Sequence, residues 1–266
     1  MISRIFSFLG RALAIYLSKP NSAYAPLTTN DPSKLAAAIK PGDVLLVEGD
    51  TRFSTAVKYI TQSTWSHAAL CIGNALGGSE PMLIEVDVLE GTIAIPLSKY
   101  AKMHTRICRP VNLSEADVQK VVQYAIARLG NAYDLKNVID LARYLLPAPP
   151  IPARWRRRLL TLGSGDPTKA ICSTLIAQAF ESVKYPILPL IVPQARGSKK
   201  ARRRNRRYRR ELLHIRHHSL YAPRDFDISP YFQVVKPTIE YGFNYKEFRW
   251  HKPSLGTKQK EADVTA

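Results

Sequence analysis

Apolar and polar positions alternate strictly over residues 82–88, in the sequence MLIEVDV. Ile84 and Val86 would lie on one face of an extended chain, and Glu85 and Asp87 on the other. This pattern predicts a β-strand with one polar face. Shorter apolar runs bounded by turn-forming residues predict four more strands, within 40–49, 66–73, 93–97 and 106–111.

Helical spacing of apolar residues occurs between and after these strands. The clearest helix begins at Ser114, which can cap it together with Asp117 in a variant of the capping box, and it ends at Gly130. Residues 170–180, AICSTLIAQAF, place their apolar side chains on one helical face. The order of strand, helix, antiparallel strands and then helices is typical of an α+β fold. Two further helices are predicted, at 51–64 and 132–147.

Composition divides the chain into three parts. Residues 1–37 are an appendage with an apolar helix and a polar linker, 38–195 hold the predicted sheet and helices, and 196–266 hold an arginine-rich segment and an extension. The apolar N-terminus contains Arg4 and Arg11 and is too short and too charged for a membrane span. We interpret it as an amphipathic helix that lies on a membrane, with a helix packed on the protein body or a signal peptide as alternatives.

The formal net charge of +18 comes largely from two short segments. Residues 199–210 hold nine basic residues, and residues 154–158 hold four. Segments of this kind bind the phosphates of RNA or of anionic lipids, or they are solvated inserts. Apolar stretches beside them, such as residues 185–193, favour an anionic membrane surface over nucleic acid.

The three cysteines, Cys71, Cys108 and Cys172, are widely spaced, and the sequence has no CxxC pair. This spacing argues against a disulfide framework and against a zinc site, and it favours a reducing compartment. The cysteine spacing thus favours the cytoplasm, and the basic and apolar segments favour a peripheral position on the inner membrane surface. We expect the protein to use no metal and no cofactor.

Cys172 is a small core residue or a nucleophile, and its partners decide between the two. His67 opens the strand at 66–73, and Glu85 or Asp87 on a neighbouring antiparallel strand can lie beside it. A carboxylate next to an imidazole favours its charged form and fixes its tautomer, and an imidazolium lowers the pKa of a nearby thiol. Asp166 and Pro167 would start the cysteine helix early, but we expect a loop up to about residue 170. Cysteine, histidine and acid are the expected set for acyl transfer.

Five segments resemble, in their order, the permuted papain-like cysteine hydrolases, relatives of the NlpC-type peptidases of the YiiX/YebB kind. The segments are PGDVLLVEG, FSTAVKYITQSTWSHAALCIG, LIEVDV, YDLKN and ICSTLIAQAF, within residues 38–185. The resemblance implies a small antiparallel sheet or barrel packed against the helix that carries the cysteine. It further implies that Cys172 is the nucleophile, His67 the base and Glu85 the third member, with Asp87 a weaker substitute and Tyr133 in the substrate cleft.

The sequence thus predicts a cysteine hydrolase or acyltransferase that acts through an acyl-enzyme on an amide or ester bond, lipid- or peptide-linked, at a membrane surface. The alternative is a catalytically silent basic protein of the same fold that binds RNA or anionic lipid.

Overall fold

The computed structural model describes residues 15–20, 31–87, 89–131, 171–188, 190–193, 211–214 and 221–240, and single residues at 242, 244 and 246. For residues 171, 172, 190–193 and 211–214 it describes the backbone alone. The predicted helix at 132–147, Tyr133 and both basic segments lie outside the described residues.

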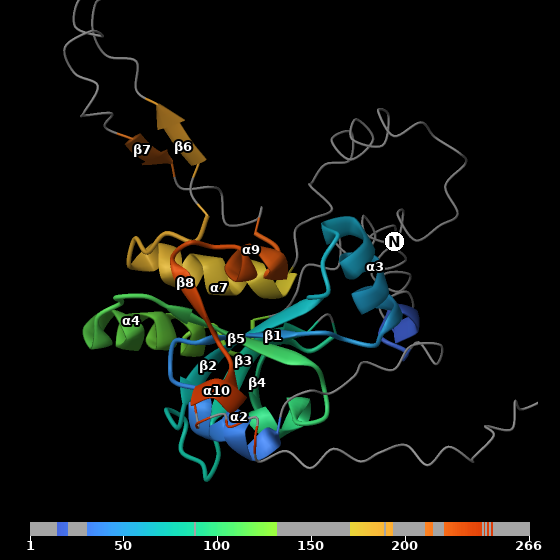
Figure 1. Cartoon of the computed structure of the whole chain (residues 1–266). Helices are drawn as coiled ribbons and strands as arrows, with labels where there is room; N and C mark the ends of the chain where they lie inside the picture. Colours follow the sequence, from blue (N-terminus) through green and yellow to red (C-terminus); the bar gives the residue numbers. More distant parts are fainter. Residues whose placement is uncertain are drawn as a thin grey trace, which may run out of the picture.

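A six-stranded antiparallel sheet in the order β4-β3-β2-β1-β5-β8 forms the centre of the molecule (Figure 1). The α+β class is confirmed, and the sheet is open, with β4 and β8 at its edges, rather than closed into a barrel. All five predicted strands are present. The strands are β1 (Val44–Val47), β2 (His67–Gly73), β3 (Met82–Asp87), β4 (Gly91–Pro96), β5 (Thr105–Pro110) and β8 (Phe232–Val235).

Helices cover both faces of the sheet (Figure 1). Ser114 caps α4 as predicted, because its hydroxyl accepts the backbone N–H of Asp117 at 3.2 Å, and Gly130 after the helix has a φ of +79°. The helices are α2 (Pro32–Ala38), α3 (Arg52–Thr61), α4 (Glu115–Ile126), α7 (Ile171–Ser182), α9 (Pro223–Asp227) and α10 (Pro237–Glu240), with a 3₁₀ turn, η1 (Leu97–Tyr100), after β4.

Strand alternation divides the interior into two cores. In β2, Ala68, Leu70 and Ile72 face the core that α4 and α7 cover, where Phe180 is fully buried. Ala69 and Cys71 face the second core, which α2 covers. His67 has the parity of Ala69 and pairs in register with Val47, a member of the second core, so its side chain lies on the α2 side of the sheet.

The direction of α7 follows from a contact at its C-terminal end. Tyr185, just beyond the helix, donates a hydrogen bond from its hydroxyl to the carbonyl of Val111 at 2.8 Å. Val111 follows the last residue of β5, whereas His67 lies at the opposite end of the sheet, since Val47 pairs with both Thr105 and His67. The N-terminal end of α7 therefore points toward the end of the sheet where β2 begins.

Residues after 195 contribute to both the sheet and the first core. β8 pairs with β5 and completes the sheet, and Phe226 and Phe232 are buried against Phe180 in the first core. Residues 221–240 therefore share the sheet and the first core with residues 38–131. Two four-residue strands, β6 (Leu190–Pro193) and β7 (Glu211–His214), pair with each other. Among the described helices, none is long and apolar enough to cross a bilayer.

A buried ion pair joins β5 to the turn before β1. Asp43, 1% exposed, accepts bonds from Arg109 Nε at 2.9 Å and Nη2 at 2.7 Å, and Arg109 Nη2 also bonds the carbonyl of Ala38 at 2.7 Å. We expect R109M to lower the free energy of unfolding by about 3–5 kcal/mol, because it leaves a buried carboxylate without its charge partner. Urea unfolding at pH 7 measures this loss.

The double variant D43N/R109M is the matched control, since it removes both charges at once. We expect it to be more stable than R109M alone. Equal stability of the single variant and the wild type would show that the pair contributes nothing.

Candidate active site

His67 and Glu85 form a part-buried imidazole–carboxylate pair on neighbouring strands. His67 Nε2 lies 2.9 Å from Glu85 Oε2, and the Glu85 side chain is 2% exposed. β2 and β3 hold the two residues, and both side chains lie on the α2 face of the sheet. The alternation of Glu85 with Ile84 and Val86 produced this placement, because only every second side chain of β3 can reach that face.

Two further groups hold the carboxylate in place. Lys99 Nζ lies 2.5 Å from Glu85 Oε1, and the hydroxyl of Tyr100 donates a hydrogen bond to Oε2. Both come from η1, which the sequence analysis did not identify. Burial by itself raises the pKa of Glu85, but the hydrogen bonds from His67, Lys99 and Tyr100, together with the charge of His67, outweigh it and lower that pKa to about 2. Glu85 is therefore ionised at neutral pH and accepts bonds at both oxygens.

This lowered pKa predicts an acid sensitivity that E85Q should remove. The carboxyl binds a proton more weakly in the folded chain, with a pKa of about 2 against an ordinary value of 4.5, so its contribution to stability is complete above pH 4.5 and is lost as the pH falls toward 2. The difference corresponds to about 3 kcal/mol. We expect wild-type stability to fall more than that of E85Q over this range, measured by urea unfolding at several pH values. Parallel curves for the two proteins would contradict the assignment.

Asp87 has a different role. Its Oδ1 accepts the backbone N–H groups of Leu89 at 2.7 Å and Glu90 at 3.0 Å, so it stabilises the turn between β3 and β4. Of the two acids on the polar face of β3, Glu85 is thus the one at the imidazole.

A cavity of about 360 Å³ opens beside the pair. Phe53 and Val57 from α3 and Met103 after η1 supply apolar walls, and His67 and Glu85 line it as well. The N-terminal segment contributes Ser18. A mixed lining of this kind can hold the apolar part of a small substrate beside the imidazole.

Residues 15–20 reach this cavity by packing on α3. The Arg52 guanidinium lies 4.2 Å from the ring centre of Tyr16, the backbone N–H of Arg52 donates to the carbonyl of Lys19 at 3.2 Å, and Leu17 is 2% exposed. Part of the N-terminal appendage therefore contacts the protein body.

Cys172 is the second residue of α7, whose backbone begins at Ile171 in the described structure. The helix body packs on the face of Ala68 and Leu70, opposite to the imidazole of His67. His67 is the first residue of β2, and α7 starts toward that end of the sheet, so a meeting of the two side chains would have to occur around the strand end. The side chain of Cys172 lies outside the described structure.

The other two cysteines are interior residues of strands. Cys71 and Cys108 are both 0% exposed, and burial raises the pKa of each thiol to about 12. Neither lines the cavity beside His67. Within the described residues, no group of three or more His, Cys, Asp or Glu side chains is placed to hold a metal ion.

A second histidine–glutamate pair lies at the same end of the sheet. His104 Nδ1 is 2.8 Å from Glu48 Oε2, and its ring packs 5.0 Å from that of Trp65, which belongs to the α7-side core. No local sequence pattern indicated this pair. The antiparallel pairing of β1 with β5 could have indicated it, because this pairing brings Glu48, just after Val47, next to His104, just before Thr105.

Comparison with known families identifies part of the chain. Residues 38–144 match the family model described as a permuted papain-like amidase enzyme of the YaeF/YiiX group. The match includes His67 and Glu85 and ends before Cys172. It confirms, over this part of the chain, the resemblance to permuted papain-like enzymes of the YiiX kind.

Among solved structures, the crystal structure of the metalloprotein yiiX from Escherichia coli O157:H7 is similar at 15% identity and a TM-score of 0.43, covering 80% of this chain and 98% of that one. At this level the likeness carries no argument about the site. The search of curated proteins gave no match.

Proposed function

We propose that this chain, whose residues 38–144 match the permuted papain-like amidases, is a cysteine hydrolase or acyltransferase that forms an acyl-enzyme at Cys172. The observation that carries the proposal is the part-buried His67–Glu85 pair at the end of the sheet toward which the cysteine helix begins. The family description points to an amide as the bond that is cleaved, and an ester is the alternative.

In the proposed reaction, Glu85 accepts a hydrogen bond from the Nε2–H of His67, so that Nδ1 is the nitrogen that takes the thiol proton from Cys172. The thiolate attacks the carbonyl carbon, and backbone N–H groups at the start of α7 help to hold the oxyanion. The amide C–N bond then breaks as His67 returns the proton to the leaving nitrogen. In the second half, His67 removes a proton from water or from an acceptor alcohol or amine, which attacks the thioester and releases Cys172.

Tyr133 belongs to the proposed substrate cleft by resemblance alone. Glu85 acts through His67, and Lys99 and Tyr100 hold Glu85 ionised and oriented.

The acyl-enzyme itself is the test of this function. We would incubate the full chain with a panel of N-acyl amides and peptides, quench in acid, and search for an acyl group on the Cys172 peptide by mass spectrometry. Hydroxylamine should release the group as a hydroxamate, because it cleaves thioesters. C172S is the matched control, and an acyl group on another residue, or on none across the panel, would refute the proposal.

We further propose that the basic residues 199–210 bring the enzyme to an anionic membrane surface, where a lipid-linked substrate would be found. Each basic residue near such a surface contributes about 1 kcal/mol, so half of the segment is enough for measurable binding. The apolar N-terminal helix would add a second anchor, and two weak membrane signals together give stable binding.

Flotation with vesicles tests the membrane proposal. We expect binding to vesicles that contain anionic lipid, weakened by salt and by deletion of residues 199–210, with Cys172 reactivity retained in the deletion variant. Equal binding to neutral vesicles, or RNA binding that far exceeds lipid binding, would contradict it. RNA binding without any acyl-enzyme would support the alternative of a catalytically silent binding protein.

A further inference from the structure

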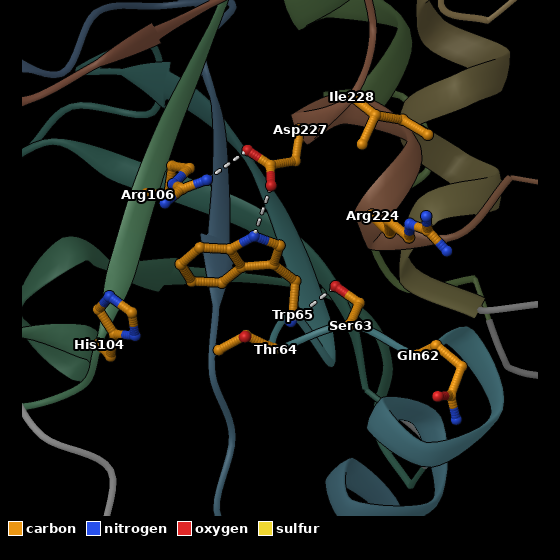
Figure 2. Close-up of a pocket in the computed structure, with 9 residues that line it drawn as sticks. All are labelled: Gln62, Ser63, Thr64, Trp65, His104, Arg106, Arg224, Asp227 and Ile228. Atoms are coloured by element: carbon orange, nitrogen blue, oxygen red, sulfur yellow. Dashed lines mark hydrogen bonds and ion pairs between the residues drawn. The ribbon is translucent and has the colours of Figure 1, made fainter.

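We infer that a second cavity, on the other side of the β2 start, binds an oxyanion, namely the phosphate or carboxylate group of a small molecule. This cavity of about 470 Å³ is distinct from the one beside His67, and the two share no lining residue. Its size is that of a small-molecule site. The segment before β2, the start of β5 and helix α9 with the residue after it supply its lining side chains (Figure 2).

Two arginines give the cavity an excess of positive donors. In Figure 2, Arg106 and Arg224 lie on opposite sides of the Trp65 indole. Arg106 Nη1 pairs with Asp227 Oδ1 at 2.7 Å, and Arg224 Nη1 donates to the carbonyl of Thr61 at 3.1 Å. A guanidinium has five N–H donors in a planar fork. The contacts with other described residues use only some of these donors, so each arginine has donors left for a ligand.

The carboxylate of the cavity lining is already engaged. Asp227 Oδ1 accepts from Arg106, and Oδ2 accepts from the indole N–H of Trp65 at 3.1 Å. The Arg106 guanidinium also lies 4.9 Å from the Trp65 ring centre. Asp227 therefore fixes Arg106 and Trp65 rather than serving a bound cation, and the lining retains a net positive charge on Arg224.

The chemistry of the lining selects the ligand. Arginine forks match the geometry of carboxylate and phosphate oxygens, and charge-assisted hydrogen bonds of this kind are about twice as strong as neutral ones. The hydroxyls of Ser63 and Thr64 and the amide of Gln62 line the same cavity, which suits a polar ligand better than an apolar one. The inference goes beyond the proposed amidase and does not depend on Cys172.

The indole N–H of Trp65 reports on this site, because it bonds Asp227 at the cavity wall. The chain has three tryptophans, so the ¹H–¹⁵N spectrum of the full chain contains three indole signals, and W65F assigns the one of interest. We would titrate with inorganic phosphate and, separately, with acetate at constant ionic strength. We expect the chemical shift of the Trp65 signal to change and to saturate. The probe that binds with the higher affinity shows whether the site prefers phosphate or carboxylate.

Substitutions separate the site from general charge effects. R224Q should weaken the affinity measured at Trp65 about tenfold, since it removes a charged donor. The affinity of R224K should lie between those of the wild type and R224Q, because lysine keeps the charge but lacks the planar guanidinium. R128Q changes the net charge equally at a residue that packs over the Tyr124 ring, 3.3 Å from its centre, and should bind like the wild type. C172A should also bind normally, whatever the outcome for the acyl-enzyme. A Trp65 signal that neither probe moves, or equal affinities of R224Q and R128Q, would overturn the inference.

Discussion

Iodoacetamide at pH 7 is expected to alkylate Cys172 at least about a hundredfold faster than Cys71 or Cys108. Burial raises the pKa of the latter two thiols to about 12, so only about one in 10⁵ of either would be ionised at this pH even if the reagent could enter. The proposed contact of Cys172 with the His67 imidazole and its place in the first turn of α7 both favour the thiolate. Timed quenching followed by peptide mass spectrometry gives the three rates.

Unfolding the chain in urea supplies the control for this experiment. The three cysteines should then react at similar rates, because the burial that protects Cys71 and Cys108 is gone. Similar rates in the folded chain, or faster labelling of either strand cysteine, would remove Cys172 from the proposed site.

H67A is expected to slow the alkylation of Cys172 by about a hundredfold at pH 6, because an ordinary thiol with a pKa of about 8.5 is only about 0.3% ionised there. With the imidazole present, the rate should be nearly constant from pH 6 to neutral pH, since an imidazolium keeps the thiol ionised. Without it, the rate should rise with pH as for an ordinary thiol. The alkylation rate of E85Q at pH 6 should lie between those of the wild type and H67A, because the amide keeps the shape of the side chain but loses the charge that orients His67.

H104A tests the competing assignment. His104 and Glu48 lie at the same end of the sheet and on the α7 side, so they form the alternative base pair for a thiol at the start of α7. A flat pH profile that is lost in H104A and kept in H67A would transfer the role of base to His104 and contradict the proposed mechanism.

The local parts of the fold could be predicted because their signals lie within a few residues. The alternation over residues 82–88 identified β3 and placed Glu85 and Asp87 on its polar face, and Ser114 and Gly130 marked the helix that follows β5. The meeting of His67 with Glu85 was within reach because consecutive antiparallel strands are usually neighbours in space.

The missed features depend on contacts that no local pattern carries. A helical stripe shows that α7 has an apolar face but not which side of the sheet it covers, so the placement of His67 and the helix body on opposite faces could not be foreseen. Lys99 and Tyr100 lie in a 3₁₀ turn of four residues, too short for a period. β8 was missed because its partner, β5, is more than a hundred residues earlier in the chain.

The pairing of β5 with β8 has a consequence for how the protein is made. β1 to β5 leave the ribosome early, but β5 can gain its outer partner only after Phe232–Val235 have been synthesised. Until then, Ile107 to Pro110 present unpaired backbone groups at an open sheet edge, and the pocket that Phe226 and Phe232 fill around Phe180 is empty. The nascent chain thus passes through a long interval in which it can join another chain, and the sheet is completed only after β8 has been synthesised.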